Sequence, residues 1–196
     1  MNILIVLAHP SPKSFNHALA QRVSATLKRR RHNVFFHDLC AEKFNPLLSS
    51  DDLVKDRIID SKLRVYCDEV SEADGLVFVH PNWWGAPPAM LKGWLDRVLR
   101  PGVAYTFEPG DKGEGVPQGL LAGKTALVFN TSDTPEQREK KVFGDPLELF
   151  WKKCVFEFCG IRNHFRITFG VVVTSSAEQR QQWLAEAEEI AVRYFP

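Results

Sequence analysis

The stretch Asn2–Ala8 (NILIVLA) is apolar on both faces and is followed at once by the polar segment His9–Ser14 (HPSPKS). A strand that is apolar on both faces is typical of the centre of a parallel sheet, which helices cover on each side. Ser14 can cap a following helix, whose apolar residues recur at helical spacing and which closes on the cationic run Lys28–Arg31. The chain therefore begins with a strand, a loop and a helix.

The same alternation continues along the chain. We expect further strands at Asn33–Asp38, Gly75–His80, Lys124–Asn130 and His164–Val173, and further helices at residues 51–72, 89–99, 145–159 and 178–194. Alternating strands and helices predict one α/β domain spanning residues 1–196, a doubly wound five-stranded parallel sheet of order 2-1-3-4-5 with helices on both faces. The segment Arg100–Gly123 is rich in glycine and proline and is expected to be a long loop.

Composition excludes several classes of protein. The 196 residues carry a formal net charge of +1, which disfavours a broad nucleic-acid surface and an acidic electron carrier. The four cysteines and six histidines show no metal-ligand spacing, so we expect no metal site and reduced thiols. No G-x-S-x-G hydrolase motif is present. Without a signal or a membrane-length apolar run, we expect a cytoplasmic protein with no membrane span.

In an open α/β sheet, ligands bind beyond the carboxyl ends of the strands at the topological switch point. For the expected order these ends follow the first, third and fourth strands. The loops His9–Ser14, Pro81–Pro88 and Thr131–Thr134 are therefore expected to converge in space and to form the ligand site.

The first of these loops opens a helix, whose free N–H groups and dipole attract anions such as phosphate. His9, Ser11 and Ser14 add side-chain donors. A proline-bent turn with a serine cap explains the same residues about as well. The loop matches neither G-x-G-x-x-G nor the Walker A motif, so those nucleotide classes lose support.

The second loop contains adjacent tryptophans, Trp83 and Trp84, in the segment HPNWWGAPP. Adjacent residues of a strand point to opposite faces, so we expect at least one indole to stand free at the strand end. A rigidly held indole suits a flat ring, and backbone amides from Asn82 to Gly85 could bond the ring's polar edge. Burial in the core or in a dimer interface is the alternative role.

The third loop offers Thr131 and Ser132 as modest candidates for ligand contact. The run Thr134–Gln137 also fits a capping box with proline at the first helical position. We expect that structural role for Thr134. His80 and His164 are expected to be structural residues at strand ends.

At the tryptophan loop a specific resemblance emerges. The chain resembles the NAD(P)H:quinone oxidoreductase family, which comprises DT-diaphorase and bacterial relatives that include ancillary subunits of potassium efflux systems. The co-linear motifs that carry the resemblance span most of the chain: LAHPSPKSFNHALA (7–20), DLCAEKFNPLLSSDD (38–52), HPNWWGAPPAMLKGWLDRV (80–98) and PGVAYTF (101–107).

The resemblance implies a flavodoxin-like fold, a flavin, a homodimer and an active site shared between subunits. FAD is favoured, with FMN as the alternative; relatives with FAD use an acidic residue such as Asp96 near the adenine. By position, the flavin phosphates and ribityl chain would contact His9, Ser14, Phe15 and Asn16. The isoalloxazine would be bordered by Pro81, Asn82, Trp83, Trp84, Gly85, Thr131 and Ser132. Trp84 and Tyr105 are the expected catalytic contacts, and the partner subunit would supply Tyr105 and Phe107 to the substrate face.

The chain departs from the family after its fourth strand. Relatives carry a Thr-Thr-Gly-Gly run there, followed by a tyrosine and a histidine near the flavin. This sequence has Asn130–Asp133 in place of the run, and Gln137 and Phe143 stand near the other two positions. The family's proton relay is therefore in question, whereas hydride transfer belongs to the flavin itself.

The expected activity is ping-pong, two-electron hydride transfer from NAD(P)H through the flavin to a quinone or similar small acceptor. The choice between NADH and NADPH and the identity of the acceptor stay open. A flavodoxin-type electron carrier and a regulatory flavoprotein subunit of a potassium efflux system are the alternatives.

Overall fold

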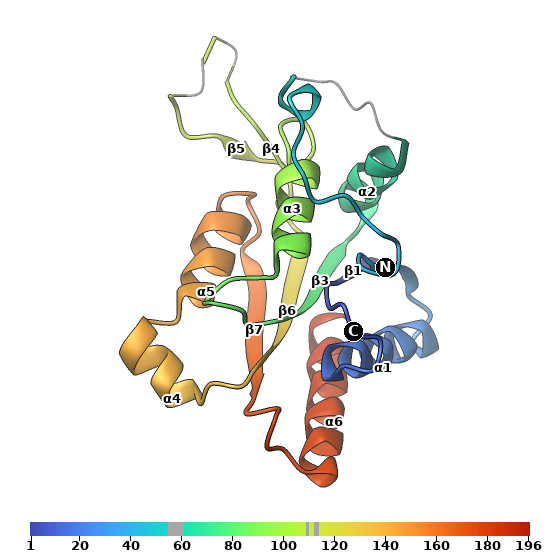
Figure 1. The fold of residues 1–196 in the computed structure, drawn as a ribbon. Helices are drawn as coiled ribbons and strands as arrows, with labels where there is room; N and C mark the ends of the chain where they lie inside the picture. The colour runs from blue at the N-terminus through green and yellow to red at the C-terminus, as the bar shows by residue number, and fades with distance from the viewer. Residues whose placement is uncertain (55–60, 109, 112–113) are drawn as a thin grey trace.

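The structure, a computed structural model, describes residues 1–54, 61–108, 110–111 and 114–196. Its centre is a five-stranded parallel sheet of order β2-β1-β3-β6-β7 (Figure 1). The strands are β1 (Asn2–Leu7), β2 (Asn33–Asp38), β3 (Gly75–Pro81), β6 (Thr125–Ser132) and β7 (Asn163–Gly170). The predicted doubly wound order is confirmed.

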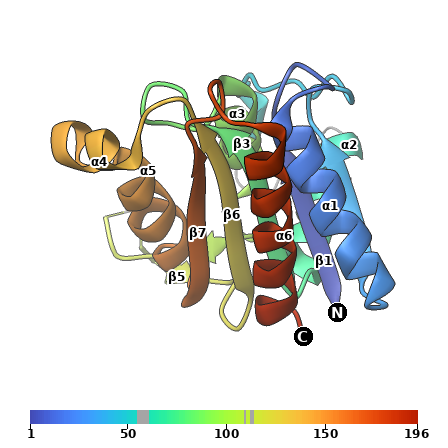
Figure 2. The ribbon, with the colours of Figure 1, turned by 90° about the horizontal axis from the view of Figure 1, so that it is seen from below.

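Helices cover both faces of this sheet (Figures 1 and 2). One face carries α1 (Phe15–Arg29) and α6 (Ala177–Tyr194), and the other carries α2 (Ser61–Glu72), α3 (Ala89–Val98) and α5 (Pro146–Leu149), which continues as the π-helical segment η3 (Phe150–Glu157). Alternate side chains of β1 enter the two cores: Leu4 packs with Trp94 and Trp151, whereas Ile5 packs with Leu19. The apolar character of both faces of β1 follows from these two cores.

The segment Arg100–Gly123 is more ordered than predicted. It contains a small antiparallel sheet of β4 (Tyr105–Thr106) and β5 (Gln118–Gly119). Gly119 lies so close to the backbone of Cys159 and Gly160 that a Cβ atom there would clash at 2.2 Å. The prediction of a plain loop was wrong because these short strands gain their order from packing against a distant helix end.

The predicted helix from residue 51 to residue 72 is only partly correct. Asp51–Leu53 forms a short 3₁₀ turn (η1), and Val54 is extended (ψ 122°), so no continuous helix starts at Asp51. Within this turn the Asp52 carboxylate accepts hydrogen bonds from Ser49 and Arg97. Residues 55–60 lie outside the described residues, and α2 ends at Glu72 as predicted.

A helical segment follows β6, where the sequence analysis had expected only the capping pattern at Thr134–Gln137 and had given no helix bounds. It comprises α4 (Glu136–Arg138) and the π-helical η2 (Glu139–Phe143); we call residues 136–143 the arm. None of its residues is buried, and Figure 2 shows α4 projecting away from the sheet. Pro135 holds the N-cap position without a side-chain bond, so the predicted capping role of Thr134 was wrong.

The ends of two strands also differ from expectation. β6 extends through Thr131 and Ser132, which therefore end a strand instead of forming a loop, and they pair with Phe169 and Gly170 of β7. β7 ends at Gly170, before the predicted Val173. All four cysteines are free thiols, and none of the described helices is long and apolar enough to cross a membrane.

Candidate functional site

A cavity of about 380 Å³ opens at the carboxyl ends of β1, β3 and β6. All of the predicted cofactor-binding residues except Trp84 and Gly85 line it: His9, Ser14, Phe15, Asn16, Pro81, Asn82, Trp83, Thr131 and Ser132. Asp133, Thr134, Val172 and Val173 complete the wall. The three segments that the sequence analysis expected to converge therefore meet at one place.

The N-terminus of α1 forms one end of this cavity. Ser14 is the N-cap, and its hydroxyl oxygen accepts a hydrogen bond from the backbone N–H of His17. The first turn of α1 carries no acidic side chain. The amides of Phe15 and Asn16 precede the first intrahelical bond, so they and the helix dipole favour an anion here.

A buried hydrogen-bonded chain lies behind Ser14. The Ser14 hydroxyl contacts His17 Nδ1 at 2.9 Å, and His17 Nε2 lies 2.8 Å from an Asp38 carboxylate oxygen. His17 is 7% exposed and links the start of α1 to the end of β2. Sequence analysis missed His17 and Asp38, although a histidine three residues after a serine cap is a signal that could have found the first of them.

Two amide side chains present acceptors that no described protein group satisfies. Asn16 donates from Nδ2 to Thr131 Oγ1 at 2.9 Å, and Asn82 donates from Nδ2 to Glu139 Oε1 at 2.9 Å. The Oδ1 atoms of both asparagines are buried and lack a partner. A buried acceptor without a donor is costly, so each marks a place where a ligand donor fits.

The tryptophan loop is a tight turn at the other end of the cavity. The backbone groups of Trp83 and Ala86 bond each other in both directions at 3.1 Å, and the two residues between them, Trp84 and Gly85, have φ angles of +57° and +71°. The left-handed conformation strains Trp84, and such strain gathers at functional sites. The Trp84 side chain is fully exposed, which confirms the prediction of a free indole.

A second, larger cavity of about 650 Å³ shares Asn82 and Thr134 with the first. Trp84 and Gly85 lie here, opposite the arm residues Arg138, Glu139, Val142 and Phe143. Phe143 stands where relatives were expected to carry a histidine. The sequence analysis missed the contribution of Glu139 because its partner, Asn82, is 57 residues away.

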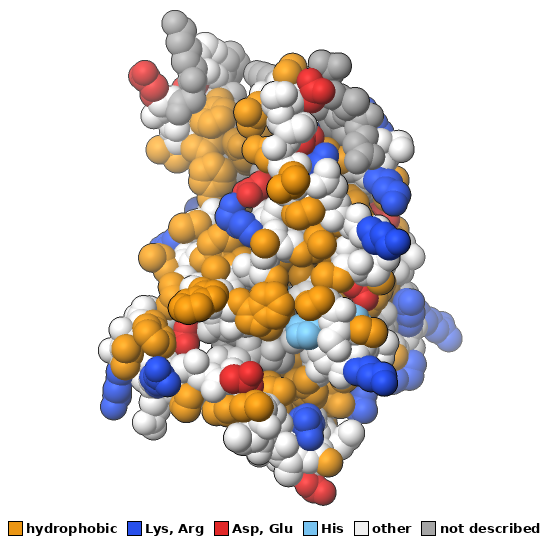
Figure 3. Space-filling model, viewed as in Figure 1, with side chains coloured by type: hydrophobic (Ala, Val, Ile, Leu, Met, Phe, Trp, Pro, Cys, Tyr) orange, Lys and Arg blue, Asp and Glu red, His pale blue; other side chains and the backbone are white. Residues whose placement is uncertain are grey.

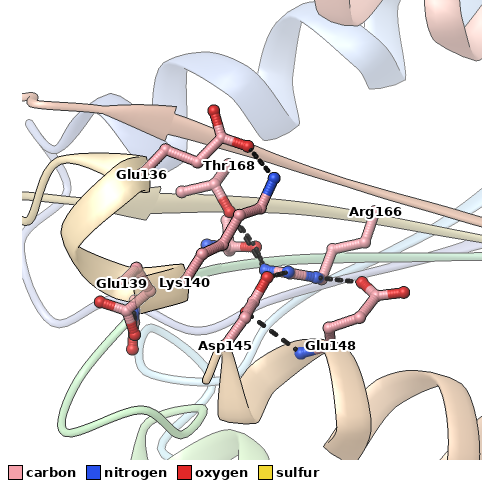
Figure 4. Close-up of polar contacts among 9 residues, drawn as sticks. Glu136, Glu139, Lys140, Asp145, Glu148, Arg166 and Thr168 are labelled. Atoms are coloured by element: carbon pink, nitrogen blue, oxygen red, sulfur yellow. Dashed lines mark hydrogen bonds and ion pairs between the residues drawn. The ribbon is translucent and has the colours of Figure 1, made fainter. Parts of the chain in front are cut away.

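Arg166 anchors the far end of the arm (Figure 4). Its guanidinium bonds Asn130 Oδ1 at 3.1 Å, Glu148 at 3.0 Å and the Asp145 carboxylate. Asp145 has a φ of +48° and caps α5 by accepting from the Glu148 amide. This largely buried ion pair fixes the chain directly after the arm, and the sequence analysis did not predict it.

Burial governs the charge of two histidines near the strand ends. Desolvation lowers the pKa of His80 to about 4. Its Nε2 accepts from the Trp151 indole N–H at 3.1 Å, so the ring is a neutral structural element, as predicted for His80. Desolvation, with the nearby His17 adding to it, also lowers the pKa of His9.

Tyr105 and Phe107 do not reach the cavity within this chain. They lie on the β4–β5 side of the molecule, at the opposite end from α4 (Figure 1). Their rings contact each other at 5.8 Å, and Tyr105 also packs on Phe158 at 5.0 Å. Any role at the cavity requires a second subunit.

Comparison with known proteins shows the protein family to which this chain belongs. Residues 1–191 match the family model described as a flavodoxin-like fold, and the chain belongs to that family. The fold class predicted from the sequence is thereby confirmed.

The chain is 39% identical over 170 residues to an uncharacterized NAD(P)H oxidoreductase of Haemophilus influenzae, covering 83% of this chain and 80% of the relative. It is 33% identical over 207 residues to a mouse ribosyldihydronicotinamide dehydrogenase [quinone], covering 93% and 87%. Among solved structures, Smu.1420 of Streptococcus mutans is 31% identical with a TM-score of 0.84, covering 97% and 98%. The predicted resemblance and the predicted enzyme class, an NAD(P)H oxidoreductase of the quinone type, are confirmed.

Proposed function

We propose that this chain is a flavin-dependent NAD(P)H:quinone oxidoreductase that binds FAD and acts as a homodimer. The observation that carries the proposal is the cavity at the strand ends. It combines an anion-attracting helix N-terminus with two buried amide acceptors that lack donors, and the adjoining cavity that shares Asn82 and Thr134 with it adds an exposed indole held in a strained turn. The helix N-terminus suits a phosphate, the amide acceptors suit a polar chain, and the indole suits a flat ring with N–H groups.

The chain's own residues would divide the work as follows. The amides of Phe15 and Asn16, with Ser14 and His9, would hold the phosphates. Asn16 Oδ1 would accept from the ribityl hydroxyls. The Asn82 acceptor, whose orientation Glu139 fixes, would bond the polar edge of the ring. Pro81, Trp83, Thr131 and Ser132 would border the ring in this cavity, and Gly85 would border it from the adjoining one.

The bound flavin supplies hydride acceptance from NAD(P)H and two-electron delivery to a quinone or similar acceptor. Around it, the chain provides the walls. Trp84 offers a flat apolar surface, and Val142 and Phe143 face it across the larger cavity. A nicotinamide donor and a quinone acceptor would bind in turn beside this apolar surface.

The surface supports a homodimer. Figure 3 shows hydrophobic side chains gathered over α3, α5 and the base of the β4–β5 sheet. Large apolar side chains exposed in the single chain include Leu120, Val142, Phe143, Leu149 and Phe158. A second copy would cover such a surface and would bring its Tyr105 and Phe107 to the substrate face.

FAD is favoured over FMN on the resemblance to the FAD-binding members and on Asp96. This carboxylate is exposed on α3 with Lys92 as its partner at 2.5 Å, so it is accessible to the distal part of a dinucleotide. Acid release of the bound flavin followed by chromatography separates FAD from FMN.

Anaerobic mixing with NADPH or NADH tests the activity. We expect the flavin absorbance to bleach rapidly and to return when a quinone is added. A flavodoxin-type carrier would stay yellow on this time scale, and that result would overturn the oxidoreductase proposal. Gel filtration with light scattering tests the dimer.

A further inference from the structure

The Ser14 hydroxyl faces two ways. It lines the cavity, and it is also the last member of the buried chain through His17 to Asp38. A hydroxyl has one hydrogen to donate. Which neighbour receives that hydrogen depends on the protons that His17 carries.

The Asp38 carboxylate accepts hydrogen bonds throughout. Its Oδ1 lies 3.1 Å from the backbone nitrogens of both Cys40 and Ala41, and its Oδ2 lies 2.8 Å from His17 Nε2. A neutral His17 must therefore carry its hydrogen on Nε2. Its Nδ1 is then an acceptor, so the Ser14 hydroxyl hydrogen points inward and is unavailable to a ligand in the cavity.

Adding one proton to His17 reverses this arrangement. Nδ1–H then donates to Ser14 Oγ, which also accepts from the His17 backbone amide at 3.3 Å. With both lone pairs of Oγ engaged, the Ser14 hydrogen is free to donate into the cavity. The direction of one hydroxyl is thus coupled to one proton.

We propose that binding of a phosphate-bearing flavin is coupled to uptake of one proton by His17, which turns the Ser14 hydroxyl outward onto a phosphate oxygen. His17 acts through Ser14, so it is a positioning residue. This inference deepens the proposed function and rests on it. The proton comes from solvent, and no covalent bond is made or broken.

The charges around His17 agree with this coupling. Asp38 at the end of β2 stabilises the imidazolium, whereas the ring of His9, in the loop after β1, lies 6.3 Å away and edge-on. The positive end of α1 opposes the added charge, and an incoming phosphate offsets it. Independently, the unpartnered Oδ1 of Asn16, a residue only 3% exposed that lines the same cavity, points to a ligand at this place.

Calorimetry of the flavin-free protein tests the proposal. FAD is titrated at pH 8 in two buffers of different ionisation enthalpy, and the difference in heat gives the number of protons taken up. FAD is the cleaner probe, since a phosphate monoester such as that of FMN titrates itself near pH 6. Riboflavin, which lacks phosphate, is the matched ligand control.

We expect uptake of up to one proton with FAD and none with riboflavin. Because each bound FAD takes up a proton, the FAD dissociation constant should rise with pH by up to about tenfold per pH unit. His17→Gln should bind FAD more weakly, with no proton uptake and a flat pH profile. Ser14→Ala keeps His17 and should reduce the uptake, which provides a second test if the first variant does not fold.

The outcomes separate the two proposals. Tight FAD binding without proton uptake, or equal uptake by the native protein and His17→Gln, would overturn the role of His17 and leave the flavoprotein assignment standing. Failure of FAD, FMN and riboflavin alike to bind would overturn both. Equal uptake with riboflavin and FAD would show that the proton does not respond to phosphate, and this inference would fail.

Discussion

The two ends of the candidate site are built in different ways. At the α1 end, Asn16 and His17 are buried, and their side chains bond Thr131 and Asp38 on two different strands. At the other end, the arm of residues 136–143 has no buried residue. It is held to the body by a bond from Asn82 to Glu139 and by the ion pair of Arg166 with Asp145 just beyond it.

The rigid α1 end and the weakly attached arm suit different roles. Groups that hold a permanent cofactor gain from rigid placement, because the ordering cost is met on folding and not on binding. A wall that two different substrates must pass gains from weaker attachment, since segments with few buried contacts open most easily.

Removing the anchor of the arm should have the largest effect. Arg166→Ala leaves the nearly buried Asp145 carboxylate without its partner, and breaking such a pair typically costs about 3–5 kcal/mol. Urea unfolding measures the loss. Lys153→Ala, which breaks the solvent-exposed pair with Glu157, is the matched control and should leave the urea midpoint almost unchanged. Equal losses in the two variants would contradict the anchoring role.

Acid should lower the free energy of unfolding of the domain because His80 must remain neutral in the folded state. The pKa of this histidine falls from 6.5 to about 4 on folding, so between those values the unfolded chain binds a proton that the folded chain does not. Stability should therefore decrease as the pH falls through this window, by about 3 kcal/mol in total. Urea midpoints measured between pH 7 and pH 4.5 check the slope, which should be shallower in His80→Gln.

His37 contributes with the opposite sign. Burial alone would lower its pKa, but hydrogen bonds to Glu42 and Glu69 outweigh burial and raise it. Its stabilisation is complete below 6.5 and is lost as the pH rises through the raised value. Glu69→Gln should therefore lower stability more at pH 6 than at pH 9. Equal losses at the two pH values would contradict this assignment.

The same contrast explains what the sequence could predict. Continuous apolar runs predict the buried strands, and Ser14 is a local capping signal. The sheet order and the start of α1 could therefore both be predicted from the sequence. The side-chain pairs that hold the two ends of the site, such as Asn16 with Thr131 and Asn82 with Glu139, were not accessible because their members are far apart in the sequence. Arg166 and Asp145, for example, are 21 residues apart. The positive φ of Trp84 could not be predicted either, because tryptophan rarely adopts this conformation.

Replacing the exposed indole should separate stability from binding. Trp84→Gly relieves the left-handed strain at a side chain without buried contacts, which should stabilise the fold by about 1 kcal/mol. The same change removes the proposed stacking surface and should weaken flavin binding about tenfold, the equivalent of roughly 1.4 kcal/mol. Thermal unfolding and a flavin titration measure the two effects. A variant that is less stable and binds flavin more weakly, or one that is more stable and binds flavin as tightly as the native protein, would contradict this prediction.

The smallest effect is expected at the tether between Asn82 and Glu139. Glu139→Ala frees the Asn82 amide to rotate and should weaken flavin binding by about 0.5–1 kcal/mol, the worth of one net hydrogen bond. Glu139→Gln keeps the acceptor oxygen and should bind flavin as the native protein does. If Gln and Ala weaken binding equally, the lost charge and not the tether is responsible.

The central claim is that the α1 end holds the phosphates of a flavin whose ring lies toward the tryptophan turn. The most direct measurement is titration of the flavin-free protein with FAD and with riboflavin, followed by quenching of tryptophan fluorescence. The account predicts that both flavins quench and that FAD binds at least about tenfold more tightly, since charge-assisted hydrogen bonds contribute roughly 1.5–3 kcal/mol. Equal affinities, or no quenching by either flavin, would contradict it.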